Sequence, residues 1–170
     1  IQYWASLNKI FNDEFPPAES EKSGGKVSLK ESMTKMEKNC DKMQRVEAKI
    51  EELPITNVDE DLLGYAHNVV EAMHKVEAAT LKSTTFITEI EAENEDLGSF
   101  DNLVKHFLRG FSGDVTTSFK EMDNLKGERK ARWHLIFNEL MTAVEGLNKM
   151  QSDQMPLRAL LTKRYGVEFQ

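Results

Sequence analysis

The spacing of the apolar residues constrains this chain most, because they recur at alternating steps of three and four along most of its length. That spacing lines up apolar side chains along one stripe of an α-helix and is typical of helices packed side by side. Sustained alternation with a period of two, the mark of a half-buried strand, is absent from the sequence. The pattern therefore predicts an all-α fold.

Three long helices are expected from this pattern. The first runs from Ser28, where Ser28 and Glu31 form a capping box, to Leu53, just before Pro54. Its apolar seam is Leu29, Met33, Met36, Cys40, Met43, Val46, Ile50 and Leu53. The second runs from about Asp59 to Ala92. Its seam is Leu62, Ala66, Val69, Met73, Val76, Thr80, Ser83, Ile87 and Ile90.

The third long helix is expected from about Asp114 to Gln151. Its apolar positions are Val115, Phe119, Met122, Trp133, Phe137, Leu140, Val144 and Leu147. Gly127 lies in the middle, where glycine costs roughly 1 kcal/mol relative to alanine. Because the step count continues through Gly127 to Trp133, we favour one continuous helix, and a break at Gly127 into two helices is the alternative.

Three shorter helices complete the prediction. One covers the stripe from Tyr3 to Phe15, a second covers Phe100 to Phe111, and a third starts at Pro156 and ends at Gly166. The predicted fold is an elongated antiparallel helical bundle, in which the three long helices are joined by short ones that complete or cap a four-helix-like core.

The 170 residues suit a single domain. Within it, residues 1–15 form an amphipathic helix, residues 16–27 read as a flexible linker rich in Pro, Ser and Gly, and residues 28–170 form the bundle. The chain begins at Ile1 and not at Met, which indicates that a signal peptide, another domain or a tag was removed upstream. The compartment stays open.

Composition excludes several classes of protein. The net charge of −7 argues against general nucleic-acid binding, which requires a basic surface. Cys40 is the only cysteine, so an internal disulfide and a cysteine-based zinc cluster are both excluded. No apolar run approaches the roughly 18 residues that a transmembrane helix needs.

Catalytic motifs are absent from the sequence. It contains no Gly-x-Ser-x-Gly, no phosphate-binding Gly-x-x-x-x-Gly-Lys-Ser/Thr and no dinucleotide-binding Gly-x-Gly-x-x-Gly. We therefore expect no enzyme activity, no cofactor and no small-molecule substrate.

A metal site is the sharpest chemical alternative. Glu71 and His74 form one Glu-x-x-His motif, the spacing that di-iron bundles use twice, and His67 lies two helical turns before His74. That separation, about 10.5 Å along the axis, is too long for two ligands of one zinc ion. Ordinary histidines at the edge of the core are the favoured interpretation, and metal ligands are the alternative.

Two features are candidates for binding a partner. The first is a basic cluster of Lys126, Arg129, Lys130 and Arg132, which we expect to face the acidic second helix, with an anionic surface or a partner as alternatives. The second is the aromatic N-terminal stripe with Tyr3, Trp4 and Phe11, which either docks on the bundle or binds a partner groove or membrane interface.

The sequence thus favours a non-enzymatic helical-bundle module that binds another protein or itself. A bundle that binds a metal or small ligand is the main alternative, and a helical module at a membrane surface is a weaker one.

Overall fold

The computed structural model describes residues 1–16, 29–92, 126–166 and 168. It contains helix α1 (Gln2–Glu14), helix α2 (Leu29–Glu51), helix α3 (Glu60–Ala92) and helix α6 (Gly127–Tyr165). At 1.5 Å per residue, the 33 residues of α3 and the 39 residues of α6 give helices about 50 Å and 58 Å long. The predicted all-α class is confirmed.

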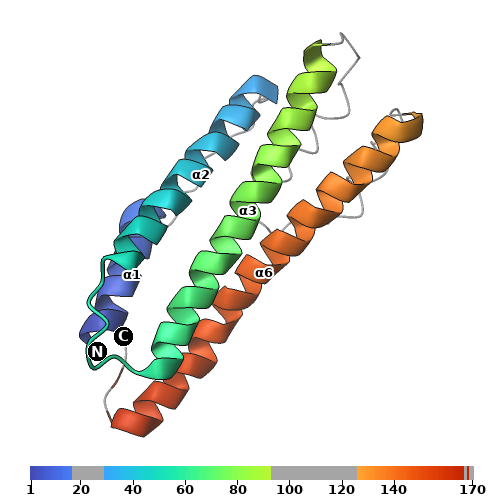
Figure 1. Cartoon of the computed structure of the whole chain (residues 1–170). Helices are drawn as coiled ribbons and strands as arrows, with labels where there is room; N and C mark the ends of the chain where they lie inside the picture. The colour runs from blue at the N-terminus through green and yellow to red at the C-terminus, as the bar shows by residue number, and fades with distance from the viewer. Residues whose placement is uncertain (17–28, 93–125, 167, 169–170) are drawn as a thin grey trace.

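Successive helices run in opposite directions along the long axis of the molecule (Figure 1). α3 and α6 lie side by side along most of their length, α2 packs on α3, and α1 packs on α2. The start of α1 and the end of α6 lie at the same end of the bundle, which we call the base, beside the connection between α2 and α3. The arrangement is the predicted elongated antiparallel bundle, with the short helix α1 in the fourth position.

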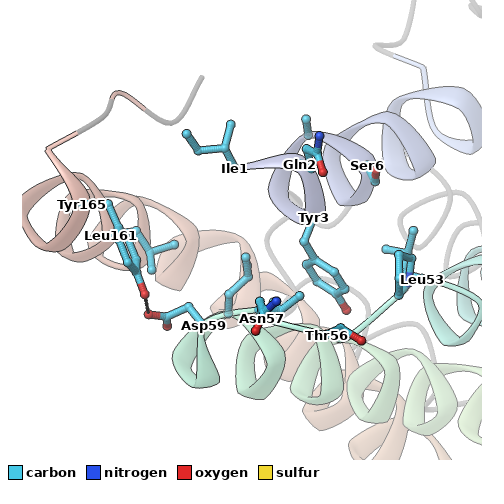
Figure 2. A pocket seen from close by; sticks show the side chains of 14 residues that line it. Ile1, Gln2, Tyr3, Ser6, Leu53, Thr56, Asn57, Asp59, Leu161 and Tyr165 are labelled. Atoms are coloured by element: carbon cyan, nitrogen blue, oxygen red, sulfur yellow. Dashed lines mark hydrogen bonds between the residues drawn. The ribbon is translucent and has the colours of Figure 1, made fainter.

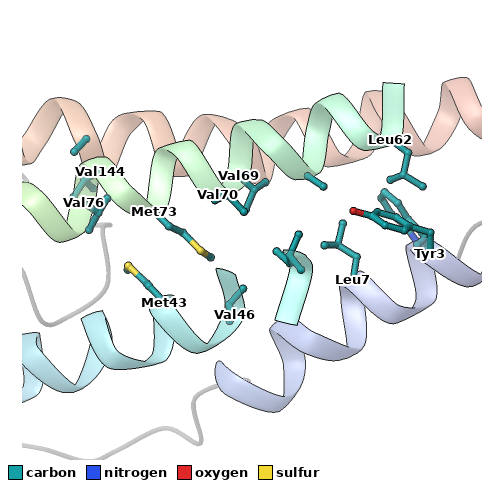
Figure 3. Close-up of a cluster of buried hydrophobic side chains, with 14 of the residues drawn as sticks. Tyr3, Leu7, Met43, Val46, Leu62, Val69, Val70, Met73, Val76 and Val144 are labelled. Carbon is teal, nitrogen blue, oxygen red and sulfur yellow. The ribbon is translucent and has the colours of Figure 1, made fainter. Parts of the chain in front are cut away.

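The main hydrophobic core draws side chains from all four helices. Val46 of α2 and Val76 of α3 are almost fully buried, and Met43 and Met73 point toward one another across the α2–α3 contact (Figure 3). α6 contributes Leu140, Val144 and Leu161. Because fully burying an aliphatic side chain contributes about 1.5–3 kcal/mol, this shared core is what holds the helices together.

α1 belongs to this core. Its Tyr3, Trp4 and Leu7 are at most 9% exposed, and the Trp4 ring lies 6.4 Å from the ring of Tyr65 on α3. On its outer side Glu14 pairs with Arg45 at 3.0 Å and Lys49 at 2.7 Å, both from α2. The docked alternative for the N-terminal stripe is therefore the one observed.

A second group of buried aromatic side chains lies toward the far end of α3 and α6. Trp133 stacks on Phe86 with ring centroids 5.4 Å apart and contacts Phe137 at 6.0 Å. Such pairs add about 0.5–1.5 kcal/mol beyond the area they bury. They fix the register between α3 and α6 away from the base.

The boundaries of α6 correct two predictions. Lys126 is extended and Gly127 has φ +59°, so the helix begins at Gly127 and a continuous helix through this glycine is wrong. At the other end the helix passes through Pro156, where we predicted a new start. Leu147, Met150, Leu157 and Leu161 pack on the core on both sides of this exposed proline. Their packing outweighs the one backbone hydrogen bond that proline removes.

The remaining boundaries agree closely with the sequence pattern. α3 begins where Asp59 accepts a hydrogen bond from the backbone N–H of Asp61, and Gly166 ends α6 in the left-handed conformation. Residues 17–27 of the linker predicted at 16–27, Ser28 of the capping box, the helix predicted at 100–111 and the stretch 114–125 lie outside the described residues.

Truncating Leu7 tests the place of α1 in the core. Leu7→Ala should lower the free energy of unfolding by about 2–5 kcal/mol, because Leu7 is 1% exposed and its loss leaves a cavity. Urea unfolding followed by circular dichroism measures the change. The control is Lys9→Ala on the exposed side of α1. Equal effects of the two variants would show that α1 does not stabilise the bundle.

Candidate partner-binding hollow at the base

An open hollow of about 1080 Å³ lies at the base of the bundle. α1, the α2–α3 connection, the start of α3 and the end of α6 all contribute to its lining (Figure 2). Its apolar lining comes chiefly from Ile1, Tyr3, Leu53, Val58, Leu62 and Leu161. Its volume lies just above the range of about 300–1,000 Å³ that is typical of ligand pockets.

Among the described residues, four of the seven exposed large apolar side chains lie at the same end. Among the large hydrophobic residues that the structure shows as exposed, Ile1, Ile55, Leu160 and Tyr165 belong to the chain ends or the α2–α3 connection. Ile55 is 65% exposed and follows the lining residue Pro54 directly. A hollow with an apolar lining and neighbouring exposed apolar side chains is typical of a surface that binds a polypeptide.

Asp59 organises the polar side of the hollow. Its Oδ1 accepts the backbone N–H of Asp61 at 2.9 Å and so caps α3, while its Oδ2 accepts hydrogen bonds from Tyr165 and Arg164, each at 2.5 Å. Arg164 also pairs with Asp61 at 2.7 Å. One carboxylate therefore joins the first turn of α3 to the last turn of α6 and fixes one wall of the hollow (Figure 2).

These hydrogen bonds also shift the pKa values of Asp59 and Tyr165. The hydrogen bond from Tyr165 and then that from Arg164 lower the pKa of Asp59, and the same carboxylate raises the pKa of Tyr165. Asp59 is thus ionised and occupied by three donors. A general base needs a pKa near the working pH, so Asp59 is not suited to that role.

Two of the three aromatic partner candidates are buried inside the chain itself. Tyr3 and Trp4 lie in the core, and Phe11 is half-buried against it. Tyr3 nevertheless lines the hollow, with its ring directed from α1 toward the α2–α3 connection (Figure 2). A partner would reach Tyr3 only through the hollow, and Trp4 packs on Tyr65 instead.

The basic cluster faces α3, as expected, through Arg132. Its guanidinium binds both carboxylate oxygens of Glu89, at 2.6 and 3.3 Å, and lies 5.3 Å from the centre of the Phe86 ring. Arg129 and Lys130, which are half-buried, also have interactions within the chain, whereas the Lys126 side chain is exposed at the start of α6. Intramolecular pairing therefore occupies most of this cluster.

The three metal-ligand candidates each have a different environment. His67 is exposed, Glu71 pairs with Lys75 at 2.7 Å, and His74 Nε2 lies 2.7 Å from Glu47 on α2. Across the described ranges, no three His, Cys, Asp or Glu side chains gather so that they could hold a metal ion. The structure thus does not bring His67, Glu71 and His74 together.

Cys40 is half-buried at the α2–α3 contact. Burial is the main cause that raises the pKa of its thiol, and a hydrogen bond with Thr80 acts in the opposite direction. Because the thiolate is the reactive form, a raised pKa disfavours reactivity. This agrees with the expectation of a small apolar side chain on the seam.

A shallower groove of about 570 Å³ runs between α3 and α6. Small residues line much of it, among them Ala72, Ala78, Thr142, Ala143 and Gly146. The Lys75–Glu71 pair lies at its edge. It carries less apolar surface than the hollow at the base.

The hollow escaped the sequence analysis because its parts are distant in the chain. In the sequence Tyr3 belongs to the N-terminal apolar stripe, Asp59 marks the expected start of the second long helix, and Tyr165 precedes the capping Gly166. Only antiparallel packing brings these three positions to one end.

The chain matches no protein-family model, no curated protein and no solved structure. Among the described helices, none has the length and apolar character needed to cross a membrane.

Removing the Asp59 carboxylate should loosen the wall of the hollow. Asp59→Ala removes the cap of α3 and both contacts to α6, so we expect a loss of about 1–2 kcal/mol in stability and faster amide exchange at residues 161–165. Hydrogen exchange and urea unfolding measure the two effects. Asp61→Ala removes one exposed contact to Arg164 and serves as the control. Unchanged exchange in Asp59→Ala would contradict this role.

Proposed function

We propose that this chain is a non-enzymatic helical-bundle module that binds another protein, using the hollow at its base. The observation that best supports this proposal is that an open hollow of about 1080 Å³ lies at the same end of the bundle as the exposed side chains of Ile55, Leu160 and Tyr165. Exposed apolar side chains scattered singly need no explanation, but a group of them beside a concave site does.

The chemistry of the hollow favours an apolar anchor on the partner. Tyr3, Leu62 and Leu161 supply apolar walls, while the Asp59 carboxylate at the edge already holds Arg164 and Tyr165. Binding anchors in protein complexes are commonly large apolar or aromatic side chains that enter such hollows. A leucine, phenylalanine or tryptophan from the partner fits this description.

A different protein is the favoured occupant over a second copy. The chain carries a net charge of −7, so two copies repel one another before their apolar ends meet. A neutral or basic partner has no such barrier. Self-association stays as the alternative and is measured directly.

Charge insertion beside the hollow should separate binding from folding. Ile55→Lys should weaken partner capture at least tenfold, because it places a charge where an apolar surface must lose water. It should change stability by no more than about 0.5 kcal/mol, since Ile55 is 65% exposed. Leu135→Lys is the matched control, since Leu135 is 72% exposed and lies near the start of α6, whereas the residues of α6 that line the hollow lie at its end.

Photocrosslinking in the cells that naturally make this protein measures binding of the partner. A benzophenone amino acid at position 55 should crosslink to a distinct second protein, and the yield should fall when Leu160→Lys is added. The same probe at position 135 should give no such product. Native mass spectrometry of the purified chain then reports any dimer. Equal crosslinking from positions 55 and 135, or none from position 55, would overturn the proposal.

A further inference from the structure

A band of polar side chains interrupts the otherwise apolar contact between α2 and α3. α2 contributes Cys40, Gln44 and Glu47, and α3 contributes His74, Glu77 and Thr80. The band borders the core residues Met43, Val46 and Val76. It is separate from the hollow at the base, whose lining includes none of these residues.

Of the two carboxylates in this band, Glu47 and Glu77, Glu47 is the more deeply buried. The residue is only 7% exposed, and its Oε2 accepts a hydrogen bond from His74 Nε2 at 2.7 Å. Its Oε1 is buried and has no hydrogen-bond donor among the described residues. A buried acceptor without a donor costs roughly 1–3 kcal/mol, and more when it is charged.

Glu77 faces the same problem from the opposite helix. Its Oε2 has a long contact of 3.5 Å with Gln44 Nε2, and its Oε1 is buried without a donor from the described part of the chain. The two glutamates also repel one another when both are ionised. A single change, protonation, removes a buried charge and creates an O–H donor for a buried oxygen.

The surrounding charges do little to keep the pair ionised. From α3, His74 acts on both carboxylates, and from α2, Glu51 adds a negative charge near Glu47. Cys40 of α2 lies near Glu77, and the carboxylates Asp41 and Glu37 of α2 act on the Cys40 thiol. α1 packs on the other flank of α2, where Glu14 occupies Arg45 and Lys49.

Burial is accordingly the largest cause that raises the pKa of both groups. For Glu47 the repulsion from Glu77 adds to it, and the imidazole of His74 opposes it. For Glu77 the contact with Gln44 and the charge of His74 oppose it without cancelling it. Both carboxyls therefore bind protons more tightly in the folded chain than in the unfolded one.

We propose that Glu47 and Glu77 form a proton-binding site that holds α2 more tightly to α3 as the pH falls from neutral into the mildly acidic range. Proton uptake neutralises the buried negative charge of these carboxylates, which lie between the helix pairs α1–α2 and α3–α6. Loss of the proton at neutral pH restores it and weakens the contact between α2 and α3.

The sign of the pH dependence follows from linkage. When a carboxyl pKa is raised by folding, stability increases as the pH falls through that raised value, until the unfolded value of about 4.3 is reached. Glu14, Asp59 and Glu71 have lowered pKa values, so their stabilisation is lost only as the pH falls below the unfolded value. The interval from neutrality down to about pH 4.5 therefore separates the pair from these three carboxyls.

Thermal unfolding at about pH 7.5 and pH 5.5 provides the first test. The melting temperature of the wild-type chain should be higher at the lower pH, by roughly 3–5 °C for each unit by which the folded pKa values of the two carboxyls together exceed 5.5, because only proton uptake between the two pH values contributes. The isosteric double variant Glu47→Gln, Glu77→Gln should lose this difference and melt higher than wild type at the neutral pH. Glu71→Gln, at an exposed position on α3, should retain it.

His74→Gln separates the carboxyls from the histidine. It keeps an N–H group that can donate to Glu47 but removes the charge that titrates. Retention of the acid stabilisation in this variant supports the carboxyl pair, and its loss assigns the effect to His74 and overturns the proposal.

Carbon-detected NMR titration of the glutamate side chains gives a readout independent of unfolding. The carboxyl carbons of Glu47 and Glu77 should titrate above the exposed Glu71, and amide exchange in residues 34–51 should slow on acidification after correction for intrinsic rates. Carboxyls that titrate with Glu71, or equal melting temperatures at the two pH values in the wild type, would overturn the proposal.

Discussion

The apolar seam of α3 is the contact on which the rest of the molecule depends. Residues such as Val69, Met73 and Val76 lie at most 3% exposed, because α2 covers one side of the seam and α6 covers the other. A helix of 33 residues with so wide an apolar stripe has no stable position at a surface. The other helices are therefore arranged around α3, and their lengths decide where each part of its seam is covered.

The short helix α1 shows what happens where the longer helices leave the core open. Leu7 and Trp4 fill the region between α2 and the base, and the Gln154–Asn8 hydrogen bond of 3.2 Å ties α1 to α6. α1 begins at the base and spans only 13 residues, so it accompanies α2 over only part of its length. The hollow beneath Tyr3 lies where the start of α1, the α2–α3 connection, the start of α3 and the end of α6 meet.

The sequence predicted those features that depend on local periodicity. The start of α3 after Asp59 and the end of α6 at Gly166 could both be predicted, since helix-capping residues and C-terminal glycines affect only the few residues next to them. Pro156 was misread because a proline in an exposed position stops a helix only when packing on either side does not hold it. The hollow and the Glu47–Glu77 pair were not readable, because both require knowing which residues of distant helices face one another.

Glu47 shows why that missing information matters for function. By periodicity it lies next to the seam residue Val46, a position where a glutamate ordinarily reaches solvent. Only the approach of α3, which brings His74 and Glu77 against it, turns this edge position into a buried one. A solvent-facing charge and a buried proton site thus share the same sequence signature, and the neighbouring helix decides between them. Positions where the expectation from local sequence fails in this way are expected to be functional sites, because stability alone does not require them.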